Sequence, residues 1–177
     1  MTDEAPPSRP PQDAQQIGSP EQFAALAHPL RQRLLFALGR RPATISGLAS
    51  QLGVAKGSVS HHLKVLRAAG LVYVAETRQV RGGTEQRYQR TARRMVVADP
   101  EAAGTAAMFG AFAQELDRSP EGSAVRLRHL HLGPDKARRL RELLVELVDE
   151  AEEDEDDQPV LGVLVALYRP AGPAGGG

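Results

Sequence analysis

The chain has 177 residues, enough for one ordinary domain with an appendage, and its low aromatic content of 4% means that its core is built from Leu, Val and Ala. It contains no cysteine, which excludes disulfides, thiolate metal sites and a cysteine nucleophile and favours a cytoplasmic location. Residues 1–18 lack the apolar segment of a signal peptide, and no apolar run approaches the roughly 20 residues of a membrane span. We therefore expect no membrane partner.

The net charge of zero hides an uneven distribution along the chain. Residues 19–98 carry 13 Lys and Arg against 3 Asp and Glu, a net charge of +10, whereas residues 99–177 carry 8 against 16, a net charge of −8. A field of one sign over such a segment attracts a polyanion. The pattern therefore favours a nucleic acid as the partner of residues 19–98.

Both ends of the chain are expected to be disordered, because residues 1–18 are rich in Pro and Gln and residues 170–177 consist of Pro, Ala and Gly. Order is expected to begin where Ser19, followed by Pro20, caps a short helix that ends at His28. A second helix follows at once. Its apolar stripe consists of Leu30, Leu34, Leu35 and Leu38.

The next two predicted helices have the spacing of a helix-turn-helix. The first is capped by Thr44 or Ser46 and ends at Gly53, which supplies the turn. The second runs from about residue 57 to residue 69, and Gly70 closes it. Three residues of this second helix are expected to point inward: Val59, Leu63 and Leu66.

A β-hairpin is predicted next, with strands at residues 71–74 and 86–91 and a flexible, arginine-rich loop at residues 78–84. The C-terminal part is expected to form a helix and then a strand-helix-strand; the ranges are 100–116 for the first helix, then 124–132, 134–150 and 160–168. The predicted fold class is therefore mainly α with a β-hairpin wing, a winged helix-turn-helix, plus a C-terminal α+β strand-helix-strand extension. We expect residues 19–98 to form the first domain and residues 99–169 a dimerisation or effector domain.

The exposed side of the helix at residues 57–69 has the chemistry of a reader of the DNA major groove. Ser58 and Ser60 are short donors and acceptors near its N-terminal end, while His61 and Lys64 reach further along the groove. The wing is expected to lie along the DNA backbone or in the minor groove. The predicted DNA-contacting residues are Thr44, Ser46, Lys56, Ser58, Ser60, His61, Lys64, Arg78, Arg81 and Arg87.

Three stretches resemble the ArsR-type winged-helix regulators; they read AHPLR at 27–31, LASQLG at 48–53 and VSHHLKVLRAAGLV at 59–72. The resemblance covers about residues 26–95, under half of the chain. It implies that the second helix of the motif reads DNA, that the hairpin is the wing, and that flanking helices pair two subunits. The residues expected at the dimer interface are Phe23, Met108, Phe109, Phe112 and Leu116.

The chain departs from this family in its metal chemistry. Founding members sense metals through cysteines or through carboxylate and histidine pairs on the last helix, so we expect no metal and no cofactor in this cysteine-free chain. His129 and His131 would share one face of a strand, but no third ligand is spaced nearby. For His62 a structural role or a contact to the DNA backbone is expected. The acidic run at 149–157 is either a solvated helix end or a competitor of DNA for the wing.

These features predict a homodimeric, sequence-specific repressor that binds double-stranded DNA, and they leave open whether it responds to an effector. The alternative is a winged-helix module that binds a protein or a ligand and does not read DNA, since a fold does not fix a function. No set of residues for acyl transfer or phosphate binding is visible, so we expect no enzyme.

Overall fold

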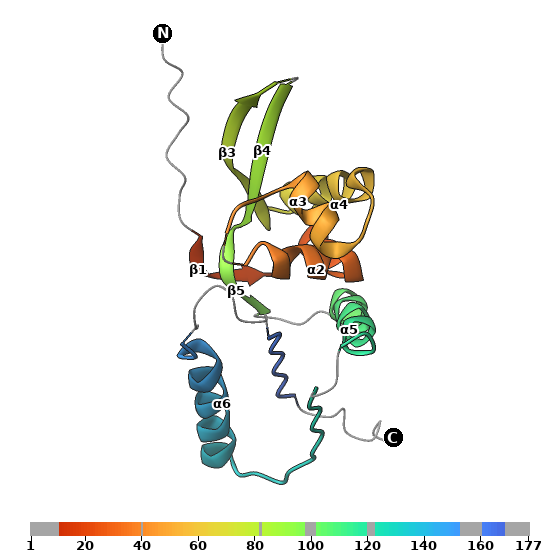
Figure 1. The fold of residues 1–177 in the computed structure, drawn as a ribbon. Helices are drawn as coiled ribbons and strands as arrows, with labels where there is room; N and C mark the ends of the chain where they lie inside the picture. The colour runs from red at the N-terminus through yellow and green to blue at the C-terminus, as the bar shows by residue number, and fades with distance from the viewer. Residues whose placement is uncertain are drawn as a thin grey trace. The chain divides into compact units, whose positions relative to one another are not determined.

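The computed structural model describes residues 11–39, 41–81, 83–97, 102–119, 123–152 and 161–168 (Figure 1). The chain forms two units, residues 1–123 and residues 124–177. The first unit is a winged helix-turn-helix, and the fold class predicted for it is confirmed. Its helices and strands, in chain order, are β1 (Gln12–Ile17), α1 (Pro20–Leu26), α2 (Pro29–Ala37), β2 (Ala43–Thr44), α3 (Ile45–Leu52), α4 (Lys56–Ala68), β3 (Val72–Val80), β4 (Gly83–Arg90), β5 (Ala92–Val97) and α5 (Ala102–Leu116).

The helices of the first unit begin and end within about two residues of the predicted bounds, with α1 ending at Leu26 where His28 was predicted. The Ser19 hydroxyl accepts a hydrogen bond from the backbone N–H of Gln22, whose side chain accepts one from the N–H of Ser19, so a capping box starts α1. Gly53 ends α3 in the left-handed conformation with φ 66°, and Gly70 takes φ 69° directly after α4. Both turns therefore favour glycine, because a Cβ atom would be strained in the left-handed conformation.

The core of the first unit lies where α2, α3 and α4 meet. Leu34, Leu38, Leu48, Val59 and Leu66 are completely buried there. The predicted inward side of α4 is confirmed, because its three buried residues are Val59, Leu63 and Leu66. Burying such aliphatic side chains contributes roughly 1.5–3 kcal/mol each, which is what holds α4 against the other two helices.

A three-stranded antiparallel sheet carries the wing, with β4 in the centre between β2 and β3. The predicted hairpin is confirmed, but its strands are longer than expected, and most of the loop predicted at 78–84 is paired strand. Pairing continues outward because oppositely charged residues face each other across the hairpin, Glu76 opposite Arg87 and Arg78 opposite Glu85. A bulge at Ala75 interrupts the register between Val74 and Glu76.

The prediction that residues 1–18 are disordered is wrong for the described residues 12–17, which form β1. This strand pairs in parallel with β5, from Gln12 beside Ala92 to Ile17 beside Val97. The Gln15 side chain also donates to the backbone oxygen of Gly70 at 3.2 Å. Residues 1–10, 170–177 and Pro100 lie outside the described part of the chain. Since Ile17 has no exposed surface, the strand is anchored at its end by apolar burial.

The helix predicted at 100–116 is found as α5, and it belongs to the first unit, so the boundary between units falls at 123 and not at 98. Met108 and Ala111 of α5 are buried. A side chain at Gly104 would place its Cβ 2.7 Å from the Cβ of Phe23, so α5 approaches α1 as closely as a glycine allows. The first unit is therefore larger than the domain that the sequence predicts.

The second unit contains α6 (Pro134–Asp149), as predicted. The two strands predicted beside it do not form: residues 124–132 and the described residues 161–168 have no regular secondary structure. Their apolar patterns are typical of strands, but a strand needs a neighbour for its backbone groups, and neither segment pairs with a strand in the described part of the chain. None of the helices in the described ranges has the length and apolar character of a membrane span.

Replacing Ile17 by Ala should destabilise the first unit by about 2–5 kcal/mol, because it empties a completely buried site. Urea unfolding monitored by circular dichroism measures the change. Gln16→Ala is the matched control, since Gln16 is exposed on the same strand and its replacement should have little effect. Equal stability of the Ile17 variant and the unchanged protein would contradict the anchoring role of β1.

Candidate nucleic-acid interface

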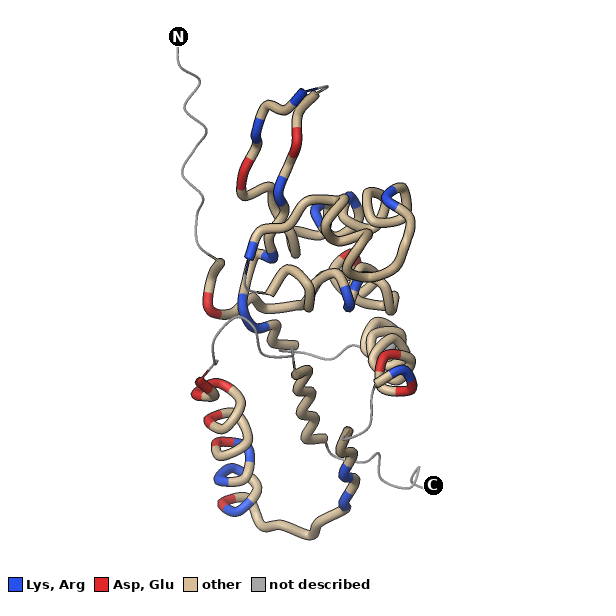
Figure 2. The backbone as a smooth tube through the Cα atoms, viewed as in Figure 1, with Lys and Arg blue, Asp and Glu red and all other residues tan. Residues whose placement is uncertain are grey.

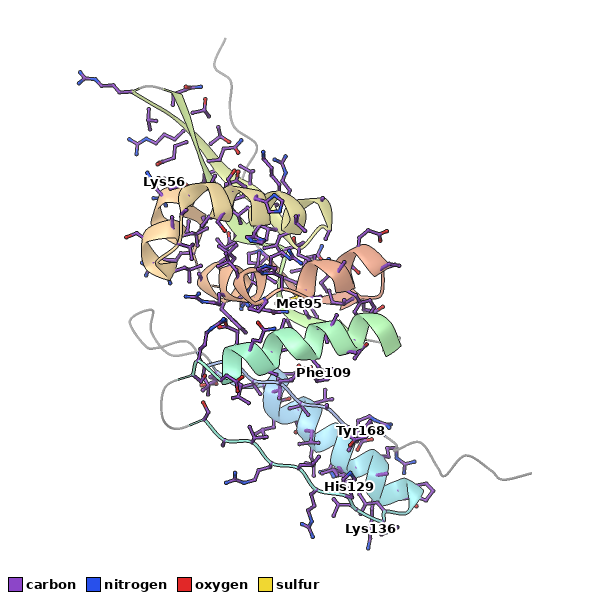
Figure 3. The ribbon with its side chains drawn as sticks, turned by 90° about the vertical axis from the view of Figure 1, so that its right-hand side faces the viewer. Lys56, Met95, Phe109, His129, Lys136 and Tyr168 are labelled. Carbon is purple, nitrogen blue, oxygen red and sulfur yellow. The ribbon has the colours of Figure 1, made fainter. Side chains whose placement is uncertain are left out.

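The turn between α3 and α4 sets the direction in which α4 presents its polar side. With Val59, Leu63 and Leu66 buried, the opposite side of the helix carries His61 and Lys64, both exposed, and Lys56 is exposed as the first residue of the helix. Figure 3 labels Lys56 at the beginning of α4, and Figure 2 shows basic positions along α4. Ser58 and Ser60 are half-buried on the flanks of this side. Of the five predicted contact residues on this helix, three are therefore exposed and two are half-buried.

Thr44 and Ser46, the two predicted contacts at the start of α3, differ in whether their hydroxyl groups are free to bind a phosphate. The Thr44 hydroxyl accepts a hydrogen bond from the backbone N–H of Gly47 at 3.0 Å and so caps α3. Ser46 is the second residue of the helix and is exposed. Thr44 therefore fixes the positive N-terminal end of α3, and the free hydroxyl there belongs to Ser46.

The wing carries more negative charge than its arginines suggest. Residues two apart on a strand share a face, so Glu76 and Arg78 of β3 and Glu85 and Arg87 of β4 line one open depression. The Nε atom of Arg87 lies 3.8 Å from Oε2 of Glu76. Residues 19–98 contain three acids in all, so two of the three stand on the wing. Of the predicted wing contacts, only Arg81 lies beyond this mixed face, exposed at the hairpin tip.

A histidine cluster, which the sequence analysis did not predict, joins the start of α2 to the middle of α4. The rings of His28 and His62 lie 4.4 Å apart between centroids, and the ring of His61 is 5.2 Å from that of His62. His28 caps α2, because its Nδ1 accepts from the backbone N–H of Leu30 at 3.1 Å. Nδ1 of His62 lies 3.5 Å from Nη1 of Arg31. The structural role expected for His62 matches this packing.

Arg31 ties the cluster to the end of α1. Its guanidinium donates to the backbone oxygens of Ala24 and Ala25 in the last turn of α1. Burial lowers the pKa of His28 below its ordinary value of 6.5, and the charge of Arg31 lowers it further. The pKa of His62 is also lowered, first by burial and then by His28 and Arg31. Both rings are therefore kept neutral beside a permanent cation.

The residues expected at a dimer interface divide into two groups. Phe23 and Met108 are buried in the core of the first unit. Phe112 packs against that core and is half-buried, while Phe109 and Leu116 are exposed along α5 (Figure 3). Only the exposed pair is free to meet another subunit without rearrangement of the core.

The described residues contain no group of three or more His, Asp or Glu arranged to hold a metal ion. His129 and His131 are exposed in a segment that forms no strand, so the shared face on which their pairing depends is absent. The acidic run predicted at 149–157 is described only as far as residue 152; the rest lies outside the described ranges.

Residues 28–74, from the cap of α2 into β3, match the family model of the bacterial regulatory proteins of the arsR family. This segment is therefore similar to the arsR family, in agreement with the resemblance predicted from the sequence. The ArsR segment contains the helix-turn-helix and the histidine cluster.

A transcriptional repressor SmtB homolog of Synechocystis sp. is 44% identical over 59 residues, which make up 33% of this chain and 43% of that protein. The chain thus matches less than half the length of this curated relative. An ArsR-like transcriptional regulator from Rhodococcus sp. RHA1 is 26% identical, with 75% of this chain and 91% of that chain covered and a TM-score of 0.33. HlyU from Vibrio cholerae is 23% identical, covers 56% of this chain and 90% of its own, and has a TM-score of 0.33. Because both TM-scores are low, the fold is assigned from the helices and strands of this chain itself.

The free energy of unfolding should decrease as the pH falls from about 7.5 to about 5. The pKa values of His28 and His62 are lowered in the folded state, so the stabilisation from their neutral forms is present above 6.5 and is lost as the pH falls through the folded pKa values. Urea titrations at each pH measure this dependence. The double variant His28→Asn and His62→Gln should flatten it, because Asn still caps a helix.

The control for this experiment is His61→Gln. His61 is exposed, so its replacement should leave the pH dependence in place. A double variant with the same pH dependence as the unchanged protein would show that the cluster does not control acid stability.

Proposed function

We propose that the chain is a sequence-specific, DNA-binding transcriptional repressor that acts as a homodimer. The observation that carries the proposal is the exposed surface of α4, where His61 and Lys64 lie opposite a buried apolar side and Lys56 is exposed at the start of the helix. Such a helix can enter the major groove without disturbing the core. In a two-fold dimer the two copies of α4 would enter grooves about 34 Å apart. The SmtB homolog, named as a transcriptional repressor, supports the direction of regulation.

Within this proposal the contacts divide by type. Lys56, Lys64 and Arg81 contact phosphates and set the affinity for any sequence, while Ser60 and His61 contact base edges and set the preference. Thr44 acts indirectly, because its hydroxyl caps α3 and thereby directs the positive end of that helix to a phosphate. Cysteine-based metal sensing has no part in it, since the chain has no cysteine.

The competing function is a winged-helix module that binds a protein or a ligand. Arg78 and Arg87 do not argue against it, because they face Glu85 and Glu76 on the wing. The lysines of α4 do, since they have no such acids on their own helix, and a protein-binding helix has no need of them. The charge on α4 therefore favours DNA.

Lys64→Ala should weaken binding to every DNA sequence and reduce the slope of log K against log salt by about 1, because one phosphate contact is lost. His61→Ala should instead change the order of preference among sequences, at a cost of about 1–3 kcal/mol for the preferred site. Fluorescence anisotropy with a selected operator and a scrambled duplex, at several salt concentrations, separates the two effects. Arg126→Ala, an exposed change in the second unit, is the control. If neither variant altered binding, DNA reading by α4 would be excluded.

Glu85→Gln should tighten DNA binding at low salt. Glu85 stands opposite Arg78 on the wing, and removal of its charge leaves Arg78 free to attract a phosphate. The same duplex titration measures the gain, which should shrink as salt rises. Glu21→Gln removes an acid of the same segment away from the wing and serves as the matched control. Equal affinities of the Glu85 and Glu21 variants would mean that this face of the wing does not meet DNA.

A further inference from the structure

The second unit has an unusual lack of burial. None of its described residues, 124–152 and 161–168, is buried, although α6 and the segments around it are rich in Leu and Val. On α6, Leu143 is 45% exposed and Leu147 is 73% exposed, and Leu161 beyond the helix is 85% exposed. A unit of this size needs either a core or a partner to be stable.

The apolar residues of α6 form a seam suited to another helix. Ala137, Leu140, Leu144 and Leu147 follow one another at spacings of 3, 4 and 3, the repeat with which two helices pack side by side. The seam is also symmetric along the helix, because position 142 lies midway between 137 and 147 and midway between 140 and 144. A helix turned end for end would therefore present its seam in the same register.

The charges on α6 are divided between its two halves (Figure 2). Residues 134–141 contain four basic residues and one acid, a net charge of +3, whereas residues 142–150 contain four acids and no basic residue, a net charge of −4. This order is unfavourable for a lone helix, whose N-terminus attracts acids and whose C-terminus attracts bases. Ion pairs along the helix join Arg138 and Arg139 to Glu142, and Arg138 to Asp135. No basic residue lies within four positions of Glu146.

We propose that α6 pairs in antiparallel fashion with α6 of a second copy of this chain. The pairing sets the basic half of each helix beside the acidic half of the other, which compensates the charge order that a lone helix disfavours. Ala137 then lies opposite Leu147 of the other copy, and Leu140 lies opposite its Leu144. A parallel pair would place like charges side by side, so the charges also select the orientation. The contact is two-fold symmetric, since each copy offers the same surface.

This contact deepens the proposed homodimer but rests on residues of the second unit alone, and it stands or falls independently of DNA binding. A different protein helix or a segment of the chain's own second unit are the other occupants of the seam. Neither of these occupants explains why the charges of α6 are complementary to those of the same helix turned end for end.

The absence of cysteine allows a direct test of orientation in the full-length protein. Ala137→Cys and Leu147→Cys proteins, one carrying an affinity tag to shift its mass, are mixed under reducing conditions and then oxidised. A disulfide-linked dimer of the two different variants is expected, with little linkage when either variant is oxidised alone. Strong linkage of each variant to itself would show parallel pairing, and no linkage in the mixture would show that α6 does not meet a second copy; either result overturns the proposal.

Charge reversal tests the physical cause. The variant Lys136→Glu with Arg139→Glu and the variant Glu146→Lys with Glu150→Lys should each self-associate on the order of tenfold more weakly in sedimentation equilibrium, because the first makes both halves of α6 negative and the second leaves residues 142–150 without net charge. An equimolar mixture of the two should regain the affinity. Weak association in the mixture would contradict the proposal even if both variants fold.

A Lys64→Ala version of the two cysteine variants separates this contact from DNA reading. It should lose DNA affinity and keep the cross-link. In the cysteine variants that keep Lys64, a failed cross-link with intact DNA binding would refute the α6 contact alone, and an intact cross-link without DNA binding would refute the proposed function alone.

Discussion

The first unit depends on the burial of one side of α4. Val59, Leu63 and Leu66 have almost no exposed surface, and they lock the helix against α2 and α3 at one rotation about its axis. Once the rotation is fixed, the positions of Lys56, His61 and Lys64 follow from helical geometry alone. The core therefore determines which side chains can approach a ligand, although none of the core residues touches it. A substitution that lets α4 rotate would redirect all of these polar residues together.

The histidine cluster and Arg31 add a second constraint on the same helix. Arg31 holds the carbonyl groups at the end of α1, and His28 caps α2, so the neighbouring ring of His62 couples α4 to two helix ends at once. All of these contacts require neutral histidines beside a cation. The exposed side of α4 is thus positioned by apolar burial from one direction and by a neutral polar cluster from another.

The parts of this fold that could be predicted are those whose cause is local in sequence. The helix-turn-helix has caps, a glycine turn and an apolar repeat within a few residues, so its elements and its inward side are predicted correctly. β1 gave no such signal, because Gln12 to Ile17 contains one large apolar residue and pairs with a strand some eighty positions away. The histidine cluster was missed for the same reason, since His28 and His62 meet only after α2 and α4 pack. The wing acids were counted in the net charge, but their position opposite the arginines depends on the register of β3 and β4.

In the second unit the sequence errs in the opposite direction, because its local patterns predict strands that the structure does not contain among the described residues. Residues 124–132 and 161–168 have the composition of strands, yet neither segment forms one among the described residues, and the apolar seam of α6 is at most half-buried there. The sign of the charge in this unit matters for the proposed assembly. A contact between copies that uses arginine and carboxylate pairs would compete with DNA if it lay within the basic first unit. Placed in the acidic second unit, it uses charges that DNA repels overall, so DNA binding and self-association can proceed at the same time without drawing on the same cations.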